Sequence, residues 1–137
     1  MFAAAKILIV GGILNLAVAF VLGYILSNSR LKDPARPQPY LLLSHKNALQ
    51  ESFMLLGLTW AVMLAKLPEG LMLTAAWLLV GSSVFQVGGS TVAWLQGTTD
   101  EFAERSPSFY IVTINAIMAT IGVAILVYGV LNAVLTG

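Results

Sequence analysis

Residues 37–60, PQPYLLLSHKNALQESFMLLGLTW, place a short polar segment at the start of a long apolar run. The polar segment contains His45, the single histidine of the chain, together with the charged residues Lys46 and Glu51. Most of the remaining chain is hydrocarbon, since 58% of all residues are hydrophobic and 9% are charged, against about 25% charged in soluble domains. An unpaired polar group in lipid costs several kcal/mol, so polar residues that enter such a helix together indicate a functional site.

Four apolar runs organise the chain around this segment, and each is long enough to cross a hydrocarbon core, which takes about 20 helical residues. They predict helices over residues 4–27, 44–65, 71–95 and 108–134. Ser44 suits the N-cap of the second helix, and the prolines of the loop before it exclude a regular helix there. The sequence therefore predicts one all-α domain over residues 1–137, without strands. We expect a multi-pass integral membrane protein, a four-transmembrane-helix bundle of a bacterial inner membrane.

Composition excludes several kinds of site. The chain has no cysteine, which rules out disulfides, thiolate metal sites and cysteine nucleophiles. Its net charge of +1 gives no indication of nucleic-acid binding. With one histidine there is no second imidazole for a zinc site, and no Ser–His–Asp arrangement is apparent. The chemistry open to this set of polar residues is therefore limited.

One imidazole is enough to serve as the single axial ligand of a haem iron, with the opposite position open. A small bundle has little room for a macrocycle, so a haem held by His45 is expected between protomers. Basic residues at the same membrane level, Arg36 and Lys46, would then pair with the propionates. Two plainer interpretations stay open: His45 is an interfacial residue with its nitrogens in water, and the loop charges only set the membrane topology.

Asn47 and Glu51 are four residues apart and share a face of the second helix, next to the face that carries His45 and Ser52. Glu51 lies about two turns inside the helix, where an ionised carboxylate is costly unless it is paired or faces a polar cavity. We expect both residues to line the substrate side of the haem or to orient the imidazole. The alternative for Glu51 is an ion pair with a lysine, Lys46 or Lys6.

The third predicted helix contains the sequence GSSVFQVGGST, a run of small and polar residues at membrane depth. Gln86 and Ser90 are candidates for hydrogen bonds to a substrate. Gly88 and Gly89 lack side chains where a flat ligand must come close, so Gly89 is a candidate contact of the cofactor. The alternative is that this small-residue face packs against another helix.

On these two segments the chain resembles the small membrane isomerases that comprise styrene oxide isomerase and hydroxylaminobenzene mutase. The first shared feature is His45 after a long first loop, followed by Glu51, Ser52 and the LGLTW run of residues 56–60. The second is the QVGGS run of residues 86–90, followed by a loop with glycine and threonine. The similarity covers most of the chain in layout.

The resemblance implies a symmetric homotrimer that binds haem b between subunits, with His45 as the iron ligand. It implies a redox-neutral rearrangement of a small aromatic substrate, with ferric iron as Lewis acid: an aryl epoxide to an aldehyde, or an aryl hydroxylamine to an aminophenol. Catalytic roles would fall to Asn47, Glu51, Gln86 and Ser90. This chain departs from the isomerase pattern at Glu51, where the family has an asparagine, so the substrate can differ.

Two other classes of protein fit the composition. A small transporter built from dimerising four-helix units usually needs an acid in its first helix, and here that helix offers only Asn15, which we expect to form a helix–helix hydrogen bond. A structural or assembly subunit without chemistry suits the low charge and the small-residue faces equally well. A haem absorbance band in the purified protein distinguishes the isomerase from both.

Overall fold

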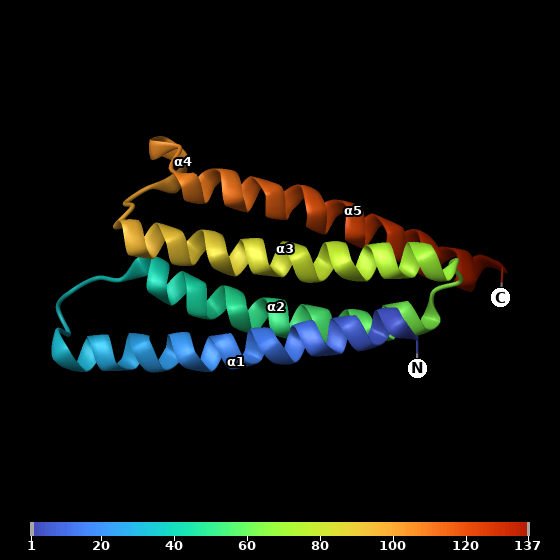
Figure 1. Cartoon of the computed structure of the whole chain (residues 1–137), viewed down its shortest axis with the longest axis horizontal. Coiled ribbons are helices and arrows are strands. Elements are labelled where there is room, and N and C mark those ends of the chain that lie inside the picture. The colour runs from blue at the N-terminus through green and yellow to red at the C-terminus, as the bar shows by residue number, and fades with distance from the viewer. Residues whose placement is uncertain (1, 137) are drawn as a thin grey trace.

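The computed structural model describes residues 2–136 and contains four long helices and one short one (Figure 1). The helices are α1 (Ala3–Lys32), α2 (Pro39–Leu64), α3 (Glu69–Gln96), α4 (Glu101–Glu104) and α5 (Pro107–Thr136). No strand occurs within residues 2–136, as the sequence predicts. The long helices run alternately up and down, so both ends of the chain lie at the end opposite the α1–α2 loop.

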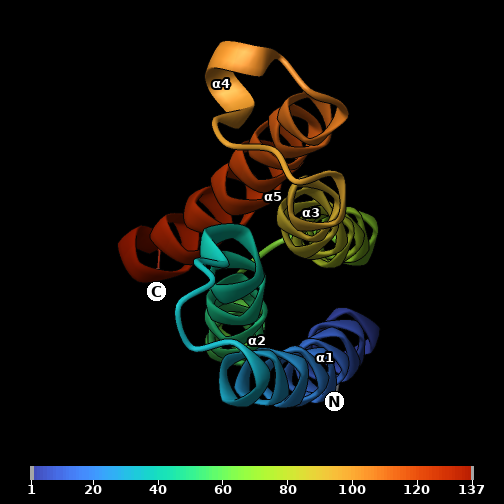
Figure 2. The same ribbon diagram turned by 90° about the vertical axis from the view of Figure 1, so that its left-hand side faces the viewer.

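The long helices do not form a closed square. α1, α2 and α3 pack against one another, whereas α5 packs mainly along α3 and touches α2 less (Figure 2). Glycines allow these close approaches, because a Cβ on Gly12 would lie 2.8 Å from Leu56 Cγ of α2. In the same way, a Cβ on Gly122 of α5 would lie 2.8 Å from Leu79 Cγ of α3. The architecture is therefore a group of three helices, α1, α2 and α3, with α5 packed against the outside of this group along α3.

The start of α2 and the loop before α5 differ from the prediction in ways that bear on the site. α2 begins at Pro39, because a proline with its fixed φ suits the first position of a helix. Ser44 is consequently a buried interior residue and not an N-cap, and its hydroxyl accepts a hydrogen bond from Thr91 at 3.2 Å. The loop before α5 contains the additional single-turn helix α4, which Asp100 caps.

The interior divides into two apolar clusters. One, near the α2–α3 turn, contains Leu8, Leu55, Leu79 and Leu126. The other, near the α1–α2 loop, is built around Ala19, Leu22, Leu41, Ala48 and Val87. Buried polar side chains also occur on the helices between these clusters, and they are described below with the site.

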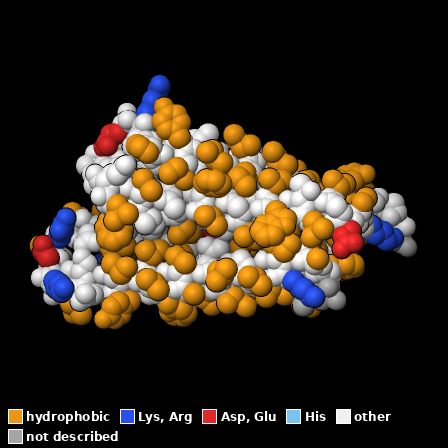
Figure 3. All heavy atoms as spheres, in the orientation of Figure 1, with side chains coloured by type: hydrophobic (Ala, Val, Ile, Leu, Met, Phe, Trp, Pro, Cys, Tyr) orange, Lys and Arg blue, Asp and Glu red, His pale blue; other side chains and the backbone are white. Residues whose placement is uncertain are grey.

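The outer surface is suited to lipid. Three helices, α1, α3 and α5, are long and apolar enough to cross a membrane. Hydrophobic side chains cover the middle of the face in Figure 3, and charged side chains gather at its two ends. Large side chains such as Phe20, Trp60 and Trp77 are exposed along the helices. The chain is therefore consistent with a membrane protein. Between residues 2 and 136, α2 is the one long helix that does not meet the same criterion, because polar residues fill its first half.

Candidate functional site

His45 lies on the face of α2 that packs against α1. Its Nδ1 atom is 2.8 Å from the carbonyl oxygen of Ala19. Gly23, one turn further along α1, leaves room for the ring, because a Cβ there would lie 2.9 Å from His45 Cε1. A carbonyl oxygen can only accept, so Nδ1 is the donor in this hydrogen bond, and Nε2 is the ring nitrogen left for another partner.

The Nε2 atom of His45 makes no hydrogen bond to protein among residues 2–136, and the ring is only half-buried. No group of three or more His, Asp or Glu side chains suited to a metal ion occurs in that part of the chain. The site therefore offers one nitrogen donor with its orientation set by a backbone carbonyl. Imidazoles that bind a metal are commonly oriented in this way, by a hydrogen bond from the other ring nitrogen to a carbonyl or carboxylate.

Asn47 and Glu51 lie on the opposite face of α2 and not beside His45. Each helical residue turns by about 100°, so Asn47 is about 200° and Glu51 about 240° from His45 around the helix. The structure agrees, because Asn47 Nδ2 donates to Ser90 Oγ of α3 at 3.2 Å. Neither side chain orients the imidazole, since the Ala19 carbonyl does so. Within one chain, His45 therefore does not share a pocket with Asn47 and Glu51.

Glu51 has no compensating partner. Its Oε2 atom is buried and has no hydrogen bond to any described residue, and no ion pair joins it to Lys46 or Lys6 in residues 2–136. The ion-pair alternative is therefore not realised within the chain. Ser52 Oγ is likewise buried without a hydrogen-bond partner among the described residues. Buried polar atoms are nearly always paired. Glu51 Oε2 and Ser52 Oγ can therefore each form a hydrogen bond with a ligand, a water molecule or a second chain.

The polar wall of α3 contacts both of its neighbours. Ser90 meets Asn47 of α2, and Gln86 Oε1 accepts a hydrogen bond from Asn115 Nδ2 of α5. Because α2 and α3 are antiparallel with Asn47 opposite Ser90, one turn deeper brings Glu51 to the level of Gln86. Asn115 is thus a site residue that the sequence analysis missed. The signal for it was a carboxamide within a long, mostly apolar helix.

The adjacent glycines Gly88 and Gly89 of α3 have different surroundings. A Cβ on Gly89 would lie 2.6 Å from Val112 Cγ2 of α5, so Gly89 is a helix-packing position, as the alternative interpretation expected. A Cβ on Gly88 would meet nothing within 4 Å. Gly88 instead lines an apolar groove between α1 and α3, together with Asn15.

Asn15 forms the helix–helix hydrogen bond that the sequence predicts. Its Nδ2 atom donates to Ser83 Oγ of α3 at 2.9 Å and to the Gly11 carbonyl of its own helix at 3.0 Å. Both side chains are buried. This bond ties α1 to α3 without leaving a donor for a ligand contact in this arrangement.

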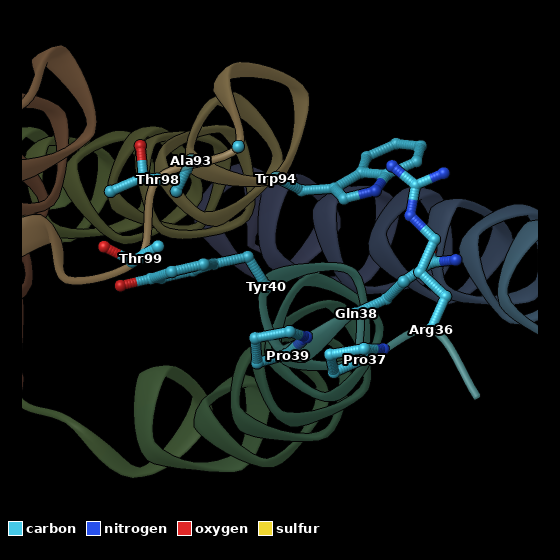
Figure 4. Close-up of a pocket in the computed structure, with 10 residues that line it drawn as sticks. Arg36, Pro37, Gln38, Pro39, Tyr40, Ala93, Trp94, Thr98 and Thr99 are labelled. Atoms are coloured by element: carbon cyan, nitrogen blue, oxygen red, sulfur yellow. The ribbon is translucent and has the colours of Figure 1, made fainter.

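Arg36 lines a cavity of about 320 Å³ between the α1–α2 loop, the start of α2 and the end of α3. Figure 4 shows the Arg36 side chain extending beside the indole of Trp94, with the Tyr40 ring across the cavity. No salt bridge engages Arg36 within the described part of the chain. Lys46 is exposed on α2 and does not line this cavity. Arg36 is therefore the better placed of the two predicted anion-binding residues.

Comparisons of the chain with models of protein families, with curated proteins and with solved structures each found no match.

Proposed function

We propose that this protein is a haem-dependent membrane isomerase that rearranges a small aryl substrate without net oxidation or reduction. One observation carries the proposal: His45 Nδ1 is held by the Ala19 carbonyl, which leaves Nε2 as an oriented donor for iron. The substrate class, an aryl hydroxylamine or an aryl epoxide, comes from the sequence resemblance. When bound, ferric haem supplies a Lewis acid that polarises an N–O or C–O bond.

The residues around His45 support this role. Gly23 lets the imidazole lie against α1, which removes the ring's freedom to rotate. The apolar cluster of Leu22, Leu26 and Leu41 occupies the same end of α1 and α2 and keeps water from the reacting group. Arg36 supplies an unpaired positive charge at the loop end, where a propionate would be stabilised.

A complete site would need more than one chain. His45 faces α1, whereas Asn47 and Glu51 face α3, so a single protomer cannot place both groups on one substrate. In the homotrimer that we propose, the partly exposed Glu51 side chain of one protomer would meet the haem held by its neighbour, while Asn47 stays paired with Ser90 inside the protomer. The unpaired Glu51 Oε2 atom supports this arrangement, because a substrate hydroxyl or amine would satisfy it.

We further propose that α2 crosses the membrane together with the other three long helices. α2 contains 26 residues, which at about 1.5 Å per residue makes a helix of about 39 Å. It packs along both α1 and α3, which are themselves long and apolar enough to span. A helix held between two spanning helices lies at the same depth, and its buried polar residues, such as Asn47 and Ser52, are then shielded from lipid by its neighbours.

The test is the absorbance spectrum of the purified protein, with and without added haemin. We expect a Soret band in the wild type and conversion of phenylhydroxylamine or styrene oxide to its isomer. His45→Ala should lose the haem, or shift its band, and lose activity, while the control Lys66→Ala, at an exposed position in the α2–α3 turn, should keep the band. A His45→Ala protein with a full complement of haem and an unchanged Soret band would overturn the assignment. A wild type that stays colourless with haemin would favour the transporter or structural alternatives.

A further inference from the structure

The loop between α3 and α5 contains three acidic residues, two of which are paired by the loop itself. Asp100 Oδ1 accepts the backbone N–H groups of Phe102 and Ala103 at 3.0 and 3.1 Å. Glu104 Oε1 accepts the backbone N–H and the hydroxyl of Thr99 at 3.0 and 2.6 Å. These bonds give the loop a defined conformation in which both carboxylates have donors.

The third acidic residue, Glu101, has no such donors. Its side chain is 8% exposed, and its Oε2 atom is buried without a hydrogen-bond partner among residues 2–136. Its backbone N–H donates to Tyr40 Oη at 3.1 Å, which anchors this part of the loop on the start of α2. A buried carboxylate oxygen without a partner is costly, so Oε2 is a position where a hydrogen-bond donor, and best a cationic one, would be stabilised.

Glu101 also forms one wall of a cavity of about 280 Å³ between α4 and the first turns of α5. The other lining residues are aromatic or small: Phe102, Phe109, Val112, Thr113 and Ala116. The Phe102 and Phe109 rings meet edge to face, with their centroids 5.8 Å apart. From Phe109 to Ala116 the cavity follows α5 for about 10 Å, at about 1.5 Å per residue, away from the loop and toward the apolar part of the helix.

We propose that this cavity binds the ammonium group of an amphiphile, with the ammonium at Glu101 and the hydrocarbon along α5. An ammonium supplies the positive charge and the N–H donors that the carboxylate lacks. Aromatic side chains beside the carboxylate attract the same kind of group. The apolar wall of Val112 and Ala116 suits an alkyl chain. The ammonium could belong to the ethanolamine headgroup of a phospholipid or to a free alkylamine, and the proposal does not depend on His45 or on haem.

The experiment uses the full chain in maltoside detergent and native mass spectrometry. The probes are phosphatidylethanolamine and the same lipid with an N-acetylated headgroup, which keeps the phosphate and chains but lacks the charge. We expect the wild type to retain the unmodified lipid about tenfold better, the size of one charge-assisted hydrogen bond. Glu101→Gln should lose this preference. Glu69→Gln, an exposed carboxylate at the other end of α3, is the matched control and should keep it.

Two further arms make the result decisive. Ala116→Leu fills the hydrocarbon end of the cavity and leaves Glu101 intact, so it should also remove the preference, even if Glu101→Gln fails to fold. Calorimetry with hexylammonium identifies the source: Glu101-dependent binding of hexylammonium without lipid preference assigns the site to a free amine. The proposal is overturned if neither the lipid nor hexylammonium shows binding that depends on Glu101, or if the wild type binds both lipids equally and ignores hexylammonium.

Discussion

The two faces of α2 are built by different means. On the face toward α1, backbone groups position the side chain: the Ala19 carbonyl holds the ring of His45, and Gly23 leaves space for it. On the face toward α3, side chains pair with side chains, and Glu51 is left without a partner. In the proposed isomerase, the first face would hold the haem ligand and the second would supply Glu51, whose carboxyl group can give or take a proton. Binding and reactivity should therefore be separable by mutation.

The largest expected effect is on the α3 face. Glu51→Gln keeps the size and polarity of the side chain but removes its ability to transfer a proton, which is worth about 10²- to 10⁴-fold in rate. We expect isomerase activity to fall by at least about 100-fold with an unchanged Soret band. The measurement is product formation per bound haem. Loss of haem in this variant would show that the two faces are not separable, and unchanged activity would remove Glu51 from the chemistry.

The α1 face is tested by restoring a side chain at Gly23. Gly23→Leu should push the His45 ring from its place, because even a Cβ would lie 2.9 Å from Cε1. Overpacking of this kind costs about 1–3 kcal/mol, so haemin affinity should fall by about tenfold. Gly57→Leu is the control, since nothing lies within 4 Å of a Cβ at that exposed position of α2. Equal haemin titrations for the two variants would contradict the role of Gly23.

A smaller effect is expected from the Asn47–Ser90 pair. Hydrogen bonds between membrane helices average about 0.6 kcal/mol in double-mutant cycles. We expect Asn47→Ala and Ser90→Ala to be non-additive by about this amount in denaturant unfolding, with the haem spectrum preserved. Additive effects would show that the 3.2 Å contact contributes nothing to the packing of α2 on α3.

The smallest effect concerns the α3–α5 loop, which lies outside both faces. Hydrogen bonds from Thr99, and from the backbone of Asp100 and Thr99, hold the pKa of Glu104 below its ordinary value of 4.5. A lowered pKa in the folded state means that this stabilisation is fully present above about pH 4.5 and is lost as the pH falls through the folded pKa. Amide exchange at Thr99 should therefore be protected at neutral pH and less so in acid. In Glu104→Gln the protection of the Thr99 amide should no longer vary with pH. The haem band should be the same in this variant as in the wild type.

Several features were predictable from sequence because they depend on local composition. The four apolar runs correctly predicted four long helices without strands in residues 2–136, and Asn15 formed the expected helix–helix bond. The boundary errors were also local. Pro39 opens α2 because its missing N–H is not needed in the first turn, which moves Ser44 into the helix interior.

The relation between His45 and Glu51 was misjudged for a different reason. Their spacing of six residues, about 240° around the helix, already separated their faces, but an angle does not say which neighbouring helix each side chain meets. Which neighbour each side meets depends on where the other helices lie. The structure places α1 against His45 and α3 against Asn47, so these two residues, although close in sequence, contact different helices.

By itself, the sequence determined that the chain is helical, that its long helices are apolar, and that its single imidazole enters one of them beside polar residues. These properties follow from hydrophobicity and backbone propensity, which are sums over neighbouring residues. Only the tertiary structure decided that the Ala19 carbonyl orients His45, that Gly89 packs against α5 and that Glu101 is buried beside a cavity. Those outcomes depend on how each helix is rotated and shifted against the next, which close packing at small residues sets across long sequence separations.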